Sequence, residues 1–204
     1  MSLWKNGLIK PILRNTFLNF EKKGTGIIAG NIIRNYEMNF NGKGLAVYRE
    51  DRRKENRLEA GYITSGTNLI RQEISAESGP GATGWLQYNY RKNNLQFMSA
   101  AIADNSAHSY TQSGLIQTEL NWTNQHQLLS LYTGGSYARD RRLNGDEASG
   151  YAGGITYNRG FSRFYFTSSN YYSSPQYAGF RRGAIICNER LSWNVSPKVG
   201  VGIG

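Results

Sequence analysis

The sequence predicts an all-β protein, an antiparallel up-and-down meander of about 12 or more strands that forms a whole or partial transmembrane β-barrel. Three observations predict this fold. Side chains alternate between apolar and polar along many segments, the links between these segments alternate between short and long, and the composition is rich in glycine and aromatic residues but poor in proline. The 204 residues suit one such region rather than several domains.

The composition favours strands over helices. The chain contains 24 glycines, 14 tyrosines and 4 tryptophans but only 4 prolines, and proline is excluded from central strands because it lacks a ladder donor. The mean hydropathy of −0.57 is too polar for a bundle of membrane helices. No stretch approaches the roughly 20 apolar residues that a spanning helix requires. A β-barrel has no such requirement, because its strands alternate lipid-facing and lumen-facing side chains.

Alternation with a period of two is clearest in residues 114–122 and 151–158. In the first segment Ile116, Leu120 and Trp122 share one face, while polar residues occupy the other. We expect the polar faces to line the lumen of the barrel. The lumen-lining candidates are Gln117, Glu119, Asn121, Thr156 and Asn158.

One predicted strand departs from this pattern. Glu189 shares a face with Leu191, Trp193 and Val195, and a carboxylate that faces lipid at mid-depth is costly. A bulge, a displaced strand boundary or a soluble setting would each explain this position.

Strands and links follow a regular order along the chain. We expect strands at 30–40, 44–50, 57–64, 68–76, 83–90, 95–103, 113–122, 127–138, 150–158, 162–173, 184–195 and 199–204. The short links are 41–43, 65–67, 91–94, 123–126, 159–161 and 196–198, and the longer links are 51–56, 77–82, 104–112, 139–149 and 174–183. Tight turns at one end and long loops at the other are the layout of an outer-membrane barrel. Residues 1–204 then form one β-barrel region, with 1–25 as an N-terminal segment or extra strand and 26–204 as successive hairpins.

Three basic pieces, within 51–56, 139–147 and 179–183, fall in the longer links. Guanidinium groups bind phosphate in a bidentate manner. The outer-loop residues that we expect to contact lipopolysaccharide phosphates are Arg52, Arg53, Arg139, Arg141, Arg142, Arg181 and Arg182. An ordinary solvated loop is the alternative for each piece. The remaining basic residues of this +10 chain are spread without a lysine-rich helix or tail, so we expect no nucleic-acid partner.

Two stretches resemble parts of the large outer-membrane β-barrels of Gram-negative bacteria. Arg57-Leu-Glu-Ala-Gly-Tyr-Ile-Thr-Ser-Gly66 resembles the barrel of fimbrial ushers, and Tyr171-Tyr-Ser-Ser-Pro-Gln-Tyr-Ala-Gly-Phe-Arg-Arg-Gly183 resembles outer-membrane proteins of Bacteroidetes. With the alternating strands, the general resemblance covers residues 26–204. It implies a location in the bacterial outer membrane. Because the sequence shows no clear signal peptide and stops in mid-strand, we expect it to be a fragment of a longer chain.

The function expected from these features is that of a non-enzymatic, porin-like channel, a secretion or translocation pore, or a structural barrel. Its partners would be outer-membrane lipid, lipopolysaccharide and a translocated protein or solute, and we expect no cofactor and no metal. Two alternatives remain open. One is a soluble extracellular β-sheet adhesin or glycan-binding module, whose aromatic rings would stack on sugars. The other is an outer-membrane enzyme that uses His108, although neither His108 nor His126 has a partner at metal-ligand spacing.

Overall fold

The computed structural model describes residues 17–65, 81–105, 111–140, 146–196 and 199–204. Within these residues it contains twelve strands and no helix. The strands are β1 (Phe17–Lys22), β2 (Thr25–Arg34), β3 (Phe40–Glu50), β4 (Asn56–Ser65), β5 (Gly81–Lys92), β6 (Leu95–Asn105), β7 (Thr111–Thr123), β8 (Gln127–Asp140), β9 (Glu147–Phe161), β10 (Phe164–Ser173), β11 (Ile185–Ser196) and β12 (Val199–Ile203).

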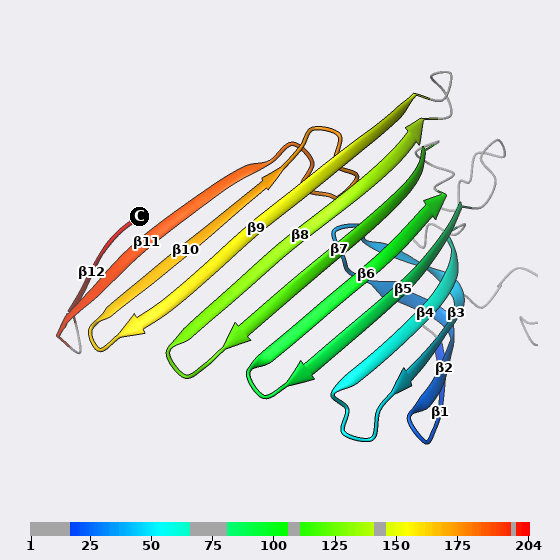
Figure 1. The fold of residues 1–204 in the computed structure, drawn as a ribbon, viewed down its shortest axis with the longest axis horizontal. Coiled ribbons are helices and arrows are strands. Elements are labelled where there is room, and N and C mark those ends of the chain that lie inside the picture. Colours follow the sequence, from blue (N-terminus) through cyan, green and yellow to red (C-terminus); the bar gives the residue numbers. More distant parts are fainter. Residues whose placement is uncertain (1–16, 66–80, 106–110, 141–145, 197–198) are drawn as a thin grey trace, which may run out of the picture.

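All twelve described strands form one sheet, and each strand pairs with its neighbours in the chain. Every neighbouring pair is antiparallel. The predicted all-β, up-and-down meander is therefore confirmed. Figure 1 shows a broad curved layer from β12 to β5, behind which β4 to β1 turn back. Among the described residues β1 pairs only with β2 and β12 only with β11, so the sheet is not closed.

The antiparallel order sorts the links into two ends of the sheet (Figure 1). The turn end, as we call it, carries the short links 23–24, 51–55, 93–94, 124–126 and 162–163. The opposite, loop end carries 35–39 and 174–184 and the ends of β4, β6 and β8 that lead onward in the chain. At 23–24 both Lys23 and Gly24 have positive φ, at 53° and 77°, which is the backbone that matches the twist of a tight hairpin.

The predicted boundaries are accurate from β6 to β12 and wrong near the start of the sheet. Residues 41–43, predicted as a turn, lie inside β3, and the chain turns at 35–39 instead. Asn-Gly is a common turn signal, but glycine also permits close packing within a strand. A Cβ atom on Gly44 would overlap the backbone carbonyl oxygen of Tyr62 on β4. The predicted strand 68–76 lies outside the described residues.

The two faces of the sheet differ in burial. The inner face carries a buried cluster that includes Ala46, Ile63, Trp85 and Leu115. The outer face is its reverse, and along β7 the neighbour of buried Leu115, Ile116, is 62% exposed. This alternation is the period of two that the sequence predicts.

No helix in the described part of the chain is long and apolar enough to cross a membrane.

Candidate functional site

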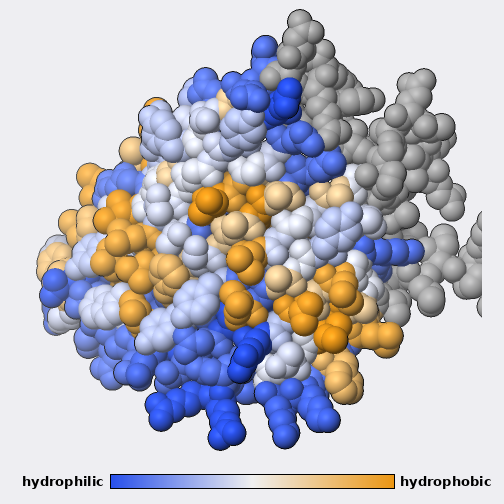
Figure 2. All heavy atoms as spheres, turned by 45° about the vertical axis from the view of Figure 1, so that its right-hand side comes forward, coloured by the Kyte–Doolittle hydropathy of each residue, from blue (hydrophilic) through white to orange (hydrophobic). Residues whose placement is uncertain are grey.

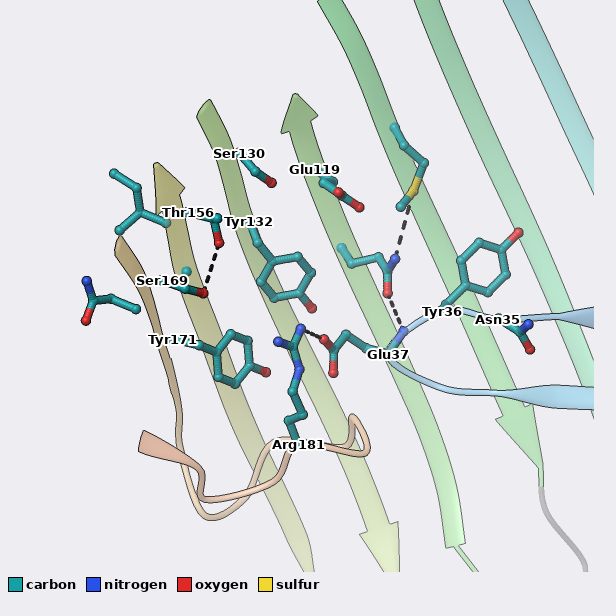
Figure 3. Close-up of a pocket in the computed structure, with 15 residues that line it drawn as sticks. Asn35, Tyr36, Glu37, Glu119, Ser130, Tyr132, Thr156, Ser169, Tyr171 and Arg181 are labelled. Atoms are coloured by element: carbon teal, nitrogen blue, oxygen red, sulfur yellow. Dashed lines mark hydrogen bonds and ion pairs between the residues drawn. The ribbon is translucent and has the colours of Figure 1, made fainter. Parts of the chain in front are cut away.

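A cavity of about 300 Å³ lies against the inner face of the sheet. Strands β6 to β10 form its wall, and two loops of the loop end reach over it: the β2–β3 loop (35–39) and the β10–β11 loop (174–184). Figure 3 shows the β2–β3 loop crossing the strands to meet the β10–β11 loop. Segments from opposite halves of the chain therefore meet at one site.

An ion pair between Glu37 and Arg181 joins the two loops. The Glu37 side chain is 4% exposed and that of Arg181 is 32% exposed. The backbone adds support, because the Phe180 amide donates to the Glu37 carbonyl over 2.7 Å and the Glu37 amide donates to Oε1 of Gln117 over 3.0 Å. Burial alone would lower the pKa of Arg181, but the hydrogen bond and charge of Glu37 outweigh it and raise this pKa. Arg181 therefore stays charged.

Tyrosine rings surround the Arg181 guanidinium (Figure 3). Its central carbon lies 3.7 Å from the centroid of the Tyr171 ring and 5.5 Å from that of Tyr132, close enough for cation–π attraction. The hydroxyls of Tyr132 and Tyr177 share a hydrogen bond. Tyr177 has no exposed surface, and burial raises its pKa to about 12. The β10–β11 loop is thus anchored on the sheet by an aromatic side chain as well as by Arg181.

Three buried polar atoms of residues that line this cavity have no hydrogen-bond partner. They are Oε2 of Glu37, Nε of Arg181 and the hydroxyl of Tyr171. Buried polar atoms in proteins are nearly always paired with protein, ordered water or a ligand. All three atoms are fully buried, so they face neighbouring protein atoms and not the open space of the cavity.

The five predicted lumen-lining residues all lie on the inner face. Gln117, Glu119 and Thr156 line the cavity. Asn121 donates to Oε1 of Glu119 over 2.7 Å, and Oδ1 of Asn158 is buried without a partner. The hydroxyls of Thr156 and Ser169, on β9 and β10, lie 3.1 Å apart. The structure thus brings three of the five together at one cavity, and their role as lining of a lumen stays a prediction.

A second polar cluster lies on the inner face of β2, β4 and β5. The Glu59 side chain is 3% exposed, and its Oε1 lies 2.6 Å from Nη2 of Arg34. Its Oε2 lies 2.7 Å from Nη2 of Arg57, and Nε1 of Trp85 donates to Oε1 over 3.1 Å. A buried carboxylate with two guanidinium groups and an indole donor is well compensated, so this cluster is a structural support for the sheet.

The predicted outer-loop arginines do not share one end of the sheet. Arg52 and Arg53 lie at the turn end, opposite Arg139, Arg181 and Arg182, so their predicted place in an outer loop beside the others is wrong. The cause is the predicted strand 68–76, with which four strands would separate the links 51–56 and 104–112; in the structure β4 pairs directly with β5, so only β4, β5 and β6 separate them in the sheet. Arg141 and Arg142 lie outside the described residues.

The three described arginines of the loop end differ in environment. Arg139 is 52% exposed and its Nε lies 3.9 Å from Oε1 of Glu147. Arg182 is exposed, and its Nε donates to the carbonyl of Tyr177 over 3.0 Å. Arg181 instead turns inward to Glu37. A sequence pattern of paired arginines in a loop cannot separate the inward residue from the outward one.

Glu37 is absent from the sequence-based candidates, because residues 30–40 read as one strand. The available signal was Arg34, which interrupts the apolar row that Ile32, Tyr36 and Phe40 would otherwise form. In the structure β2 ends at Arg34 and the chain turns. A charged residue in an apolar row can therefore mark a strand end.

The other sequence-derived candidates for chemistry do not form a reactive site in the described residues. His126 is exposed beside the 124–126 turn, and His108 lies outside those residues. Cys187 is exposed on the outer face. No group of three His, Cys, Asp or Glu side chains placed to hold a metal occurs in the part of the chain that the structure describes.

Comparison of the chain with protein-family models, curated proteins and solved structures found no match.

Proposed function

We propose that this chain is part of a bacterial outer-membrane β-barrel that acts as a non-enzymatic channel or translocation pore. The outer face of the meander is the observation that carries the proposal. Leu86, Ile116, Leu131 and Ile155 on β5, β7, β8 and β9 are each between 38% and 62% exposed. Monomeric soluble proteins rarely expose a contiguous apolar area of more than a few hundred Å², whereas lipid requires one.

These apolar residues are neighbours across the strands, so the surface is continuous. Leu86 lies opposite Ala101, which lies opposite Ile116. Leu131 lies opposite Ile155. In Figure 2 hydrophobic residues gather across the middle of the visible face, above a hydrophilic rim. A continuous apolar band with polar borders is the profile of a barrel wall in a bilayer.

Aromatic residues of the outer face lie toward both strand ends. Those near the turn end are Phe97, Trp122, Phe161, Phe164 and Trp193, and those near the loop end are Tyr62, Tyr137, Tyr151 and Tyr172. Phe164 and Trp193 stack, with ring centroids 5.8 Å apart. Amphipathic rings favour the headgroup level of a bilayer, so two such rows support a membrane-spanning wall.

The outer face carries a polar cluster of Glu189, Ser168 and Asn170. Oε1 of Glu189 accepts hydrogen bonds from Ser168 over 2.8 Å and from Asn170 over 2.9 Å. These bonds reduce the cost of a carboxylate at mid-depth without removing it. The free edges of β1 and β12 must also pair in a bilayer, with each other or with a further strand.

The inner face supports a role in passage rather than in catalysis. Its polar side chains would face water, and Gln117, Glu119 and Thr156 would set the charge and hydrogen bonding of the path. A translocated protein or a solute would use this path. At the loop end, Arg139 and Arg182 are the exposed residues proposed to contact lipopolysaccharide phosphate.

The first test is heat-modifiable migration of detergent-folded protein, together with insertion into vesicles of phosphatidylethanolamine and phosphatidylglycerol. We expect the unheated protein to migrate faster than the boiled protein and to float with the vesicles. A monodisperse protein that remains in the aqueous phase without detergent would overturn the membrane proposal and favour the soluble adhesin or glycan-binding module.

The second test is ion conductance across a planar bilayer that contains the inserted protein. Discrete conductance steps are expected of a channel or pore. Stable insertion without any conductance would leave a structural barrel and refute the transport role. If replacement of His108 by Ala leaves the conductance unchanged, passage of ions does not depend on the residue that the enzyme alternative requires.

A further inference from the structure

The turn end of the sheet is strongly basic. Its five links, taken with two strand residues on either side, carry ten lysine and arginine residues and four carboxylates in the described part of the chain. In Figure 1 the turns between β1 and β6 point downward, and in Figure 2 the lower border of the apolar band is hydrophilic. A surface of this charge attracts anions.

A hollow of about 920 Å³ lies at this end of the sheet. It is formed by β1, β3, β4 and β5 and by the turns at 23–24 and 51–55. We call it the basic hollow after four exposed side chains that line it: Lys23, Arg49, Arg52 and Lys54. None of the four forms an ion pair with another described residue, because the five salt bridges found there involve other side chains.

Three carboxylates also line the basic hollow. Oε2 of Glu21 accepts a hydrogen bond from the Tyr48 hydroxyl over 2.9 Å, and Oδ2 of Asp51 accepts one from Asn56 over 2.7 Å. Glu50 occupies an inner-face position of β3, two residues from buried Tyr48. Since the basic side chains outnumber these carboxylates and pair with none of them, the hollow favours an anion.

The basic hollow opens on the outer face of the sheet. Leu58 and Tyr88 belong to its lining, lie opposite each other on β4 and β5, and are 50% and 37% exposed. Arg49 lies opposite Leu58 in the same outer row. The hollow therefore combines unpaired positive charge with apolar surface on the side that the proposed function assigns to lipid.

A row of apolar side chains continues from the hollow toward the middle of the outer face. Val47 lies on the same face as Arg49, two residues along β3. It lies opposite Ile27, which lies opposite Phe20, and the three are between 43% and 68% exposed. A free inorganic anion would leave this row uncovered, whereas a phospholipid places a phosphate and acyl chains next to each other.

We propose that the basic hollow binds the headgroup of an anionic phospholipid, whose acyl chains lie on Phe20, Ile27 and Val47. Guanidinium groups suit its phosphate because they bind it in a bidentate manner. The inference rests on the proposed membrane location of the outer face. Because the tight turns of a barrel lie at the periplasmic end, this lipid belongs to the leaflet opposite the one proposed for lipopolysaccharide contact.

The test is native mass spectrometry of the full chain folded in a nonionic detergent. The protein is titrated with dioleoylphosphatidylglycerol or with dioleoylphosphatidylcholine, which share acyl chains and a phosphate, although only the first carries a net charge. Each basic residue near an anionic headgroup contributes roughly a fivefold gain in affinity, so we expect phosphatidylglycerol to bind saturably and roughly tenfold or more tightly than phosphatidylcholine. Equal affinities would overturn the proposal.

A third probe separates a lipid from a free anion. Glycerophosphoglycerol is the same headgroup without acyl chains, and we expect it to compete weakly with phosphatidylglycerol. If it competes as well as the whole lipid does, the hollow is a site for a free phosphodiester and the lipid proposal fails.

The matched variants are Arg49→Gln and Arg163→Gln. Each removes one exposed guanidinium from the turn end, but Arg163 lies in the 162–163 link, outside the hollow. Arg49→Gln is expected to weaken phosphatidylglycerol binding about fivefold and Arg163→Gln to leave it unchanged. Equal effects would mean that the overall charge of the turn end attracts the lipid, which refutes the site.

A second variant guards against misfolding. Arg52→Gln changes an exposed turn residue of the hollow, and we expect weaker phosphatidylglycerol binding with heat-modifiable migration retained. Retained migration with unaltered binding in both Arg49→Gln and Arg52→Gln would refute the proposal. If the protein floats with vesicles but binds both lipids equally, the site fails and the membrane location remains. A protein that stays in the aqueous phase loses both.

Discussion

Replacement of Arg181 by Gln should release the β10–β11 loop from the inner face. The change leaves the Glu37 carboxylate, which is 4% exposed, without its charge partner. Removal of one partner from a fully buried pair costs about 3–5 kcal/mol. Because Arg181 is 32% exposed and water can reach its former place, we expect the lower figure of about 2–3 kcal/mol for opening of the loop. Loss of the Tyr171 cation–π contact acts in the same direction.

Hydrogen–deuterium exchange measures this opening at defined amides. The Phe180 amide donates to the Glu37 carbonyl over 2.7 Å, and the Ala178 amide donates to Oγ of Ser136 over 2.9 Å. An opening free energy that falls by about 2–3 kcal/mol speeds exchange of these amides roughly 30- to 150-fold. Amides in the β6–β7 pairing should keep their protection, because the variant does not touch them.

The control is the same substitution in an exposed pair. Arg139→Gln removes a guanidinium that is 52% exposed and 3.9 Å from a Glu147 carboxylate that is 55% exposed. Such pairs contribute about 0–1 kcal/mol, so exchange of the loop amides should not change. If Arg181→Gln leaves the protection of Phe180 intact, or if Arg139→Gln exposes it equally, the ion pair does not hold the loop.

Three further outcomes are expected. Ile116→Lys should lower the unfolding free energy in lipid vesicles by about 2–4 kcal/mol, because Ile116 is 62% exposed on the outer face; an unaltered value measured by urea titration in vesicles means that this face does not meet hydrocarbon. Gly44→Ala should prevent refolding, because the Cβ would overlap the Tyr62 carbonyl. The control variant Gly135→Ala has open space around the new Cβ and should refold with the same heat-modifiable migration as the unchanged protein. Equal yields of refolded protein from the two variants would contradict this packing. Burial raises the pKa of Tyr177 from 10.0 to about 12, so the native loop prefers the protonated form and its stability should fall as pH rises from about 10 to about 12. Amide exchange of the loop, compared with that of a Tyr177→Phe variant, measures this loss. An equal pH response in both proteins would show that Tyr177 is not the group responsible.

Much of the fold was predictable because strand pairing and alternation obey short-range rules. In β7 the sequence alternates Leu115 and Gln117 with Ile116, and the structure buries the first two and exposes the third. Antiparallel neighbours then follow from short links. The same alternation predicted which polar residues share the inner face, among them Glu119 and Thr156, which line the cavity.

The errors come from residues whose local signal admits two physical meanings. Asn41-Gly42 predicts a turn, but a Cβ atom on Gly42 would crowd the backbone carbonyl oxygen of Thr64 on β4, so this glycine serves close packing within β3. The sequence cannot distinguish these two uses, since backbone distance between strands is a tertiary property. Arg52 and Arg53 were assigned to the wrong end for another reason: the predicted strand 68–76 would lie between β4 and β5, which pair directly in the structure.

The candidate site was unpredictable for a different reason. Glu37 and Arg181 are 144 residues apart, and each stands in a loop where a charged residue is ordinary. Their partnership depends on how strongly the sheet curls, because the loops between β2 and β3 and between β10 and β11 belong to strands eight places apart in the sheet order. A flat twelve-stranded sheet would hold them far apart.

The Glu37–Arg181 ion pair therefore depends on the curvature of the sheet as well as on the position of the β10–β11 loop. Strands about 4.8 Å apart would separate β2 from β10 by roughly 40 Å along the sheet, and only a strongly curled sheet brings their loops into contact. Strand tilt and stagger set the curvature of a rolled sheet, while Glu37 and Arg181 join the two sides of this sheet at the loop end. If curvature is intrinsic to the strands, Arg181→Gln should free the loop but leave the distance between spin labels on β3 and β10 unchanged. If that distance widens, the ion pair itself draws the two sides of the sheet together.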